Sequence, residues 1–230
     1  MIADTSPMIV TIDGPSGSGK GTAASLLASH LKWHLLDSGA LYRLTAMAVL
    51  KHKVDINDAK AVAERALHLD VGFTYNEQTR EVDIIFESEP VGAQLRTEIM
   101  GAYASQVAVL PEVRQALLQR QRDFAISPGL VADGRDMGTV VFSEAKVKIF
   151  LTASAEERAR RRVRQLQMKG IDVNFDSLLN DIRARDERDT HRSVAPLVPA
   201  DDAVIIDSTK LSISQVVSCL ITEVKKVYAL

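Results

Sequence analysis

Cysteine is almost missing from this sequence, which has only Cys219 among its 230 residues. An intrachain disulfide therefore cannot form, and we expect the protein to work in a reducing compartment. Cys219 lies in the segment 212–228, where apolar residues recur with helical spacing. We therefore expect a helix there, with Cys219 as a small residue of the core.

Long apolar runs are missing as well. No stretch approaches the roughly 18 uninterrupted apolar residues of a membrane-spanning helix, and residues 1–7 lack the features of a signal peptide. The net charge of −2 offers no overall attraction to nucleic acid or membranes, and the five histidines show no zinc-ligand spacing. We expect a soluble, cytoplasmic protein without nucleic-acid or membrane partners.

The most informative stretch is residues 8–22. Met8–Ile12 is an apolar, β-branched run that predicts a buried strand, and apolar residues recur with helical spacing from Ala23 onward. Gly21 stands where Ser or Thr is usual, and Thr22 supplies a hydroxyl one residue later. Backbone N–H groups, a helix N-terminus and the lysine of such a loop bind phosphate. The P-loop pattern of Gly, four residues and Gly-Lys is formed by Gly14, Pro15, Ser16, Gly17, Ser18, Gly19 and Lys20.

The rest of the chain alternates between strand and helix patterns. Residues 71–75 and 81–87 predict two strands joined by a polar turn at 76–79, with a short third strand at 90–92. We expect an α/β fold in one domain over 1–230, a P-loop NTPase-type parallel sheet flanked by helices. An antiparallel β subdomain would be inserted at about 63–103, and a helical lid would lie within 154–192. Further strands are expected at 33–37, 130–133, 147–151 and 203–206, and further helices from Ser38 and at 57–69, 94–109, 111–126 and 175–191.

Charged residues gather where predicted strands end. Asp133 is the last residue of a predicted strand, a position where P-loop enzymes hold Mg²⁺, so we expect Asp133 and Thr22 to reach the ion through water. A turn or capping role is the alternative for Asp133. Arg135 and Asp136 stand in a glycine-flanked loop that suits a polar ligand, with a surface pair between them as the alternative.

The apolar stripe of the predicted helix 175–191 continues into charged residues. Phe175, Leu178, Leu179 and Ile182 recur at three- and four-residue spacing, and the same face then carries Arg185, Asp189 and Arg192. Charges turned toward the protein need partners or a ligand, so we expect a ligand-binding row. An Arg185–Asp189 salt bridge at i,i+4 is the alternative.

A second arginine cluster follows Ser154 and Glu157, which predict a capping box. Arg158, Arg161 and Arg162 share one face, whereas Arg160 and Arg164 are expected in solvent. Phosphoryl transfer needs cations over the transferring group, which a mobile arginine-bearing lid would supply. The expected catalytic cations are Lys20, Arg158, Arg162 and Arg185.

Several of these segments together resemble the bacterial cytidylate kinases, a family of nucleoside monophosphate kinases. The segments are GPSGSGKGT, LLDSGALYR, LVADGRDMGTVVF, KVKIFL with EERARRR, and RDERDTHRSVAPL, spanning residues 8 to about 210. The resemblance implies phosphoryl transfer from ATP, with Mg²⁺, to CMP or dCMP. The strands at 71–92 fit that family's monophosphate-binding subdomain, and we expect a monomer.

The resemblance also implies the contacts of each substrate. Gly14–Thr22 would hold the ATP phosphates. The acceptor nucleotide would meet Ser38; its phosphate would meet Arg43, Arg135 and Arg192, its sugar Arg185 and Asp189, and its cytosine Ser105, Arg114 and Asp136.

Other P-loop functions remain open at this point. A kinase acting on a small-molecule hydroxyl is the nearest alternative. A non-catalytic nucleotide-binding module would need no acceptor site, whereas the Arg/Asp row looks like one. A GTPase is disfavoured because the sequence has no Asn-Lys-x-Asp guanine motif.

Overall fold

The computed structural model describes residues 7–76, 81–168 and 170–228. The chain divides into two compact units. The first, here called the P-loop unit, comprises Met1–Asp37 and Gln121–Leu230, and the second, the inserted unit, comprises Ser38–Arg120. Within the described residues, no helix combines the length and the apolar character needed to cross a membrane.

A parallel sheet forms the centre of the P-loop unit, and its described strands have the order β2-β6-β1-β7-β8. Because Ile12 lies beside Asp133 on one side and Ile149 on the other, the carboxyl ends of these strands meet at one edge. The predicted α/β fold is confirmed. The strands are β1 (Met8–Asp13), β2 (His34–Asp37), β6 (Gly129–Gly134), β7 (Val147–Thr152) and β8 (Val204–Asp207).

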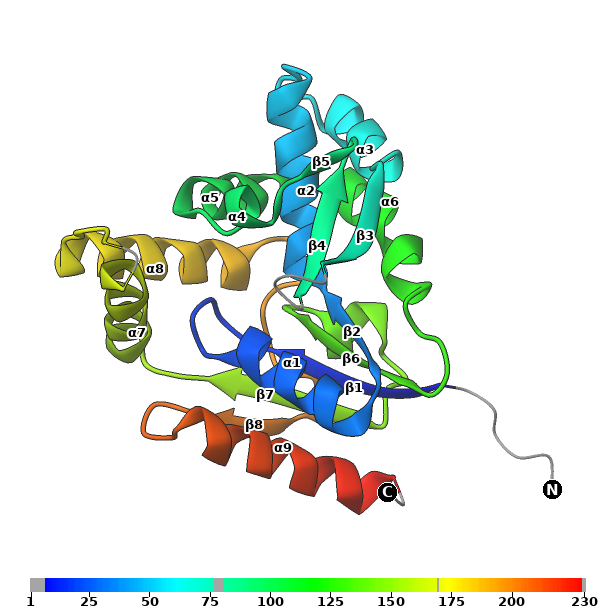
Figure 1. The fold of residues 1–230 in the computed structure, drawn as a ribbon, viewed down its shortest axis with the longest axis vertical. Coiled ribbons are helices and arrows are strands. Elements are labelled where there is room, and N and C mark those ends of the chain that lie inside the picture. The colour runs from blue at the N-terminus through cyan, green and yellow to red at the C-terminus, as the bar shows by residue number, and fades with distance from the viewer. Residues whose placement is uncertain (1–6, 77–80, 169, 229–230) are drawn as a thin grey trace. The chain divides into compact units, whose positions relative to one another are not determined.

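Helices α1 (Lys20–Leu31) and α9 (Ile213–Val227) lie side by side against the sheet (Figure 1). Leu27 of α1 and Leu220 of α9 are fully buried in one cluster with Val10 of β1. Burying a side chain of this size stabilises the fold by about 1.5–3 kcal/mol. The prediction that Cys219 is a core residue is wrong, because its side chain is exposed. It stands about 100° around the helix from Leu220, outside the buried stripe.

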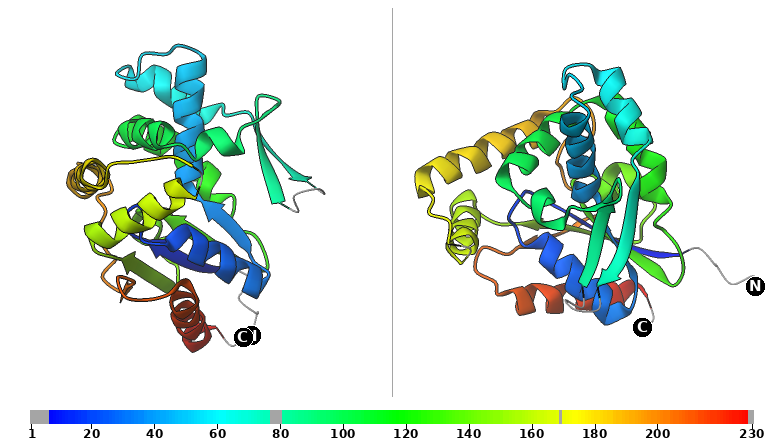
Figure 2. Two further views of the ribbon diagram at one scale, coloured as in Figure 1. Left: turned by 60° about the vertical axis from the view of Figure 1, so that its left-hand side comes forward. Right: turned by 45° about the horizontal axis from the view of Figure 1, so that its top comes forward.

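Helices α7 (Ala155–Gln167) and α8 (Phe175–His191) pack against each other (Figure 2). Helix α8 has the predicted boundaries, and the Asn174 side chain accepts a hydrogen bond from Ser177 N at its start. Of the predicted capping box at α7, the Ser154 half is present, since its hydroxyl accepts from Glu157 N. The Glu157 carboxylate lies beside Arg160 and Arg161. A reciprocal box forms instead at the start of α9.

The segment after β6 departs from the sequence prediction. The glycine-flanked segment with Arg135 and Asp136 is predicted to be a loop, but Met137–Val141 directly after Asp136 is a short π-helical turn, η1. Its first N–H groups are bonded to a residue of β1, so a contact between distant segments stabilises it.

In the inserted unit, α2 packs against α3 and α5, and β3, β4 and β5 form the antiparallel sheet (Figure 2). The predicted turn at 76–79 falls mostly on 77–80, outside the described residues. The expected subdomain 63–103 is contained in this longer unit, and its monophosphate-binding role remains a prediction. The elements are α2 (Ser38–Lys51), α3 (Ala59–Leu67), β3 (Val71–Asn76), β4 (Glu81–Phe86), β5 (Glu89–Pro90), α4 (Gly92–Leu95), α5 (Glu98–Val107) and α6 (Pro111–Arg122).

The single helix predicted over 94–109 is wrong, because the structure has α4 and α5 there. Thr97 between them is extended, with φ −76° and ψ 154°, and its side chain accepts from Met100 N as the N-cap of α5. A threonine hydroxyl competes with helical backbone hydrogen bonds, which explains the break. Helix α6 begins at Pro111 as predicted but ends at Arg122 rather than at residue 126.

Candidate active site

The P-loop joins β1 to α1 through backbone conformations that need glycine. Gly14 has φ +150°, and an added Cβ would lie 2.0 Å from the Leu151 carbonyl oxygen of β7. Gly19 has φ +94° at the N-cap of α1 and makes no side-chain capping bond. The first N–H groups of α1 therefore remain available to a phosphate, which is the usual anion site at a helix N-terminus.

Lys20 is the first residue of α1, and its ammonium donates to the Pro15 carbonyl oxygen at 3.1 Å. The side chain is buried, and burial together with nearby Arg135 and Arg185 lowers its pKa to about 7, against the attraction of Asp133. A bound polyphosphate would favour the charged form of Lys20, because an opposite charge raises the pKa of an ammonium. The loop therefore places a cation where phosphate negative charge would be stabilised.

Asp13, which the sequence analysis did not single out, ends β1 at the same edge. Its two carboxylate oxygens accept from Met137 N and Gly138 N, both at 2.8 Å. Burial raises the pKa of Asp13 to about 7, although the two N–H groups oppose this shift. The signal that pointed to Asp133, an acidic residue at the end of a buried strand, applies equally to Asp13 and would have found it.

Asp133 is the penultimate residue of β6 and lies against the first turn of α1. An added Cβ at Gly21 would be 3.1 Å from Asp133 Oδ2, so the missing side chain leaves space for this carboxylate. Thr22 is in the same turn. The described residues contain no cluster of three or more His, Cys, Asp or Glu ligands. These groups suit Mg²⁺, which is usually held by one or two carboxylates, waters and substrate phosphates.

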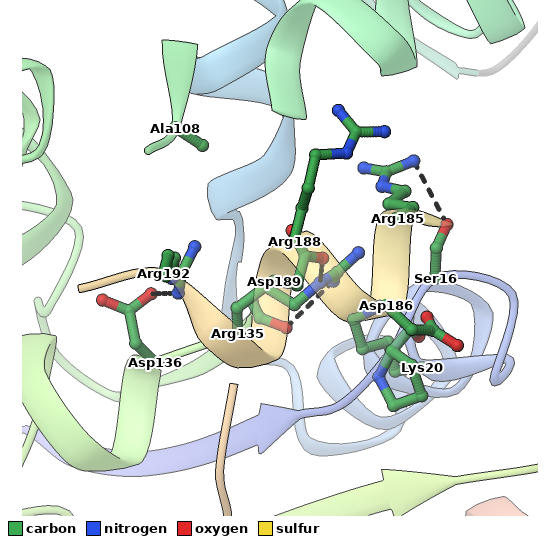
Figure 3. Close-up of polar contacts among 12 residues, drawn as sticks. Ser16, Lys20, Ala108, Arg135, Asp136, Arg185, Asp186, Arg188, Asp189 and Arg192 are labelled. Carbon is green, nitrogen blue, oxygen red and sulfur yellow. Dashed lines mark hydrogen bonds and ion pairs between the residues drawn. The ribbon is translucent and has the colours of Figure 1, made fainter. Parts of the chain in front are cut away.

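The charged row of α8 faces the loops at the strand ends (Figure 3). Arg185 Nη1 donates to Ser16 Oγ at 3.4 Å, and Asp189 Oδ2 accepts from Arg135 Nε at 3.0 Å. Burial alone would raise the pKa of Asp189, but the Arg135 and Arg185 guanidiniums hold it below its usual value. Arg185 and Asp189 each contact a residue outside α8, and both Asp189 and Arg192 are buried, so the predicted inward direction is confirmed.

Asp136 and Arg192 form a second buried pair, with Oδ1 and Nη2 3.8 Å apart (Figure 3). Asp136 follows β6, and Arg192 is the C-cap residue of α8. The Arg192 Nε also donates to the Ala195 carbonyl oxygen. The Asp136–Arg192 and Arg135–Asp189 pairs thus connect the two predicted acceptor clusters of the P-loop unit, the segment after β6 and the charged row of α8.

Arg158 holds α7 to α8 and to the P-loop. Its Nη1 and Nη2 donate to the two carboxylate oxygens of Asp186 at 3.0 and 2.5 Å, a partner that the sequence analysis missed. Its Nη1 also donates to the Ser16 carbonyl oxygen at 3.1 Å. Asp186 follows Arg185 in the sequence and therefore lies about 100° around α8 from the predicted inward row. The helical pattern alone gave no sign that it has a partner.

The other arginines of α7 differ in their surroundings. Arg161 Nη1 donates to the Ser18 carbonyl oxygen of the P-loop at 3.1 Å. Arg162, predicted to be catalytic, donates to Gln165 of its own helix at 3.0 Å. Arg160 and Arg164 are exposed, as predicted.

Four predicted acceptor contacts belong to the inserted unit. Ser38 is the buried first residue of α2, and Arg43 is half-buried on the same helix. The Arg114 guanidinium of α6 lies 5.6 Å from the centre of the Tyr42 ring and donates to the Ala108 carbonyl oxygen. Ser105 of α5 is buried, and within the described part of the chain its Oγ has no hydrogen-bond partner.

Comparison with known proteins gives a consistent set of relatives. The family model for "Cytidylate kinase" matches residues 10–226. A cytidylate kinase of Colwellia psychrerythraea is 59% identical over 210 residues, covering 91% of this chain and 92% of that protein. One from Pseudomonas aeruginosa is 61% identical over 215 residues, covering 94% and 93%. The matched range includes both the P-loop and the α8 row.

Proposed function

Because the chain belongs to the cytidylate kinase family, we propose that it transfers the γ-phosphoryl group of ATP to CMP or dCMP. The products would be ADP and CDP or dCDP. The observation that carries the proposal is the carboxyl edge of the sheet, where Arg185 of α8 donates to Ser16 of the P-loop. The same helix carries Asp189, paired with Arg135, and its C-cap residue Arg192 is paired with Asp136. A phosphate-binding loop is thus combined with arginines suited to an anionic acceptor and with carboxylates suited to the hydroxyl and amino donors of a nucleotide.

The reaction needs no general base. A phosphate oxygen of the acceptor is already ionised, and it would attack the γ-phosphorus while the bond to the β-phosphate oxygen breaks. Positioning and charge neutralisation then supply most of the barrier reduction. Lys20 and Arg185 would neutralise the charge around the transferred group, and Arg158 would support them by holding the P-loop at Ser16. Mg²⁺, reached by Asp133 and Thr22 through water, would neutralise the β- and γ-phosphates.

The acceptor contacts we propose are those that the resemblance to the cytidylate kinases implies. We assign Arg43, Arg135 and Arg192 to phosphate, and Arg185 and Asp189 to the sugar. Ser38 is a further contact of the acceptor nucleotide. Ser105, Arg114 and Asp136 are assigned to the cytosine.

Asp136 is the residue we assign to base choice. Cytosine carries an exocyclic amino donor where uracil carries a carbonyl acceptor. An ionised carboxylate only accepts hydrogen bonds, so Asp136 would favour cytosine.

A coupled assay of ADP release tests this function, with Mg²⁺-ATP against CMP, dCMP, UMP, AMP and GMP. We expect the highest efficiency with CMP and dCMP. Lys20→Met should fold yet lose about a hundredfold or more in turnover, because one charged donor in a water-excluded site is worth about 3 kcal/mol. Turnover only with a hydroxyl acceptor, or with no acceptor at all, would contradict the proposal.

A second variant tests base choice. Asp136→Asn should lower the CMP-to-UMP efficiency ratio about tenfold or more, since leaving a buried polar group unsatisfied costs about 1–3 kcal/mol. Asp181→Asn, at an exposed position of α8, is the matched control and should leave the ratio unchanged. An unchanged ratio in Asp136→Asn would remove Asp136 from the base pocket.

A further inference from the structure

Asp13 joins β1 to η1 through both of its carboxylate oxygens. Oδ1 accepts from Met137 N and Oδ2 from Gly138 N, each at 2.8 Å. The Asp13 side chain is buried, so both bonds form away from solvent. Met137 and Gly138 are the first two residues of η1, and their N–H groups have no acceptor within a helix that starts there. Asp13 therefore acts as the N-terminal cap of η1, although it comes from another strand.

This cap matters because the N-cap position of η1 is already held by an aspartate. Asp136 is the N-cap residue, yet its side chain makes no capping hydrogen bond. An aspartate at this position ordinarily turns back to accept from the N–H of the second or third residue of its own helix. Here the N–H of the second residue, Gly138, donates to Asp13, and the Asp136 carboxylate lies 3.8 Å from Arg192 Nη2. Asp13 thus competes with Asp136 for a capping N–H group.

Two other features hold η1 in this place. The Asp136 carbonyl oxygen accepts from Val140 N at 2.9 Å and Val141 N at 3.2 Å, so the Asp136 backbone is held by η1. A Cβ added to Gly138 would lie 2.9 Å from Thr11 Oγ1, so the missing side chain lets η1 approach β1 closely. With the backbone of Asp136 held, its side-chain direction depends on which groups compete for it.

We propose that Asp13 is a positioning residue for acceptor-base selection: it caps η1 from β1 and thereby keeps the Asp136 carboxylate turned away from its own helix and toward the acceptor base. This inference rests on the proposed function, specifically on the assignment of Asp136 to the cytosine. Asp13 itself touches no substrate in this account. Its loss should therefore change the choice between bases, and not only the stability of the fold.

The test compares CMP and UMP efficiencies in Asp13→Asn, Asp136→Asn and the double variant. Asp13→Asn keeps the side-chain size but offers one acceptor oxygen where two N–H groups require two. We expect its CMP-to-UMP ratio to fall at least about tenfold, as in Asp136→Asn, and the double variant to fall no further than Asp136→Asn alone. Asp207→Asn is the matched control, because Asp207 ends β8 and accepts from Thr209 N of its own turn. It should keep the wild-type ratio.

Hydrogen exchange supplies a readout that does not depend on activity. In the wild-type protein the Met137 and Gly138 amides should be protected, and in Asp13→Asn at least one should exchange faster. If Asp13→Asn does not fold, Asp13→Ser, which keeps one acceptor, takes its place in both measurements. Rapid exchange of both amides in the folded wild type would overturn the capping role and with it the inference.

The outcomes separate this inference from the proposed function. If Asp136→Asn loses the CMP preference while Asp13→Asn keeps it, the positioning role of Asp13 is wrong and the assignment of Asp136 stands. If Asp136→Asn keeps the wild-type ratio, the assignment of Asp136 fails, and the role of Asp13 in base selection fails with it. A drop of both efficiencies in Asp13→Asn at a constant ratio would show a purely structural role and would also overturn the inference.

Discussion

At the scale of single residues, Gly21 shows how a missing side chain shapes the candidate Mg²⁺ site. An added Cβ would stand 3.1 Å from Asp133 Oδ2, so Gly21→Ala should displace the carboxylate. We expect kcat/KM for Mg²⁺-ATP to fall roughly tenfold, because small displacements in an active site are costly. The melting temperature should stay equal or rise, since alanine is favoured over glycine in a helix by about 0.5–1 kcal/mol.

The control for Gly21→Ala is Gly92→Ala at the start of α4. Its added Cβ would meet no atom within 4 Å, so activity should not change. Unchanged activity in Gly21→Ala as well would show that Asp133 does not need its present position.

Lys20 gives a pH dependence whose sign can be worked out. Its pKa is lowered to about 7 in the folded protein by burial and by Arg135, whereas an unfolded lysine keeps a pKa near 10.5. Between these values the unfolded chain binds a proton that the folded chain does not, so stability rises with pH. Without nucleotide and Mg²⁺, the stability of wild type relative to Lys20→Met should rise by about 1.4 kcal/mol per pH unit from pH 7.5 to 9. A flat difference in denaturant titrations would contradict this.

At the scale of elements, Arg158 and Asp186 connect α7 to α8. The Arg158 side chain is 5% exposed and that of Asp186 25% exposed, so the pair is largely shielded from water. Asp186→Ala would leave the guanidinium buried without its carboxylate, which costs about 3 kcal/mol or more. Chemical denaturation measures this loss.

A control exists between the same two helices. Arg183 and Glu156 are 2.6 Å apart, but their side chains are 56% and 43% exposed. Exposed ion pairs contribute little, so Glu156→Ala should leave stability nearly unchanged. Equal losses in the two variants would mean that burial does not govern the connection of α7 to α8.

At the scale of the whole molecule, residues from near both ends of the sequence meet in the P-loop unit. The Tyr228 hydroxyl accepts from Ile9 N at 3.2 Å and donates to the Ile9 carbonyl oxygen at 3.0 Å. Its ring meets that of Trp33 edge-on, with ring centres 5.7 Å apart. Burial raises the pKa of Tyr228, as expected for a hydroxyl enclosed by protein. β1 begins at Met8, whereas its pairing with β7 begins at Val10. The Tyr228 hydroxyl thus binds the backbone of β1 just before that pairing starts.

Tyr228→Phe should therefore destabilise the fold by about 1–3 kcal/mol, since it removes both hydrogen bonds of Ile9 and keeps the ring contact. Thermal unfolding measures the change, and ATP kinetics in the folded variant should stay at the wild-type level. Trp33→Phe, which keeps the hydroxyl contacts, separates the ring contribution from that of the hydrogen bonds. An unchanged melting temperature in Tyr228→Phe would show that the ring alone holds the segment.

Elements whose signals are local could be predicted from the sequence. The strand and helix around the P-loop follow from periodicity and glycine spacing, and α8 has the predicted boundaries because its cap and apolar stripe lie within one segment. The inward direction of Asp189 and Arg192 followed from the same helical phase. The resemblance of the motifs to the cytidylate kinases likewise needed only residue types in order.

The contacts between distant groups could be known only from the folded chain. Asp13 with η1, Asp186 with Arg158, and Asp189 with Arg135 are contacts between segments far apart in the chain, which no local pattern encodes. Cys219 and Thr97 show the same limit on a smaller scale. Cys219 is exposed because it lies one residue away from the buried Leu220 on α9. The Thr97 hydroxyl caps α5 and so divides the segment that periodicity alone predicts as one helix. For the three contacts between distant segments, competition among nearby donors and acceptors in three dimensions decides the outcome, because each buried polar group takes the partner that the packed fold brings to it.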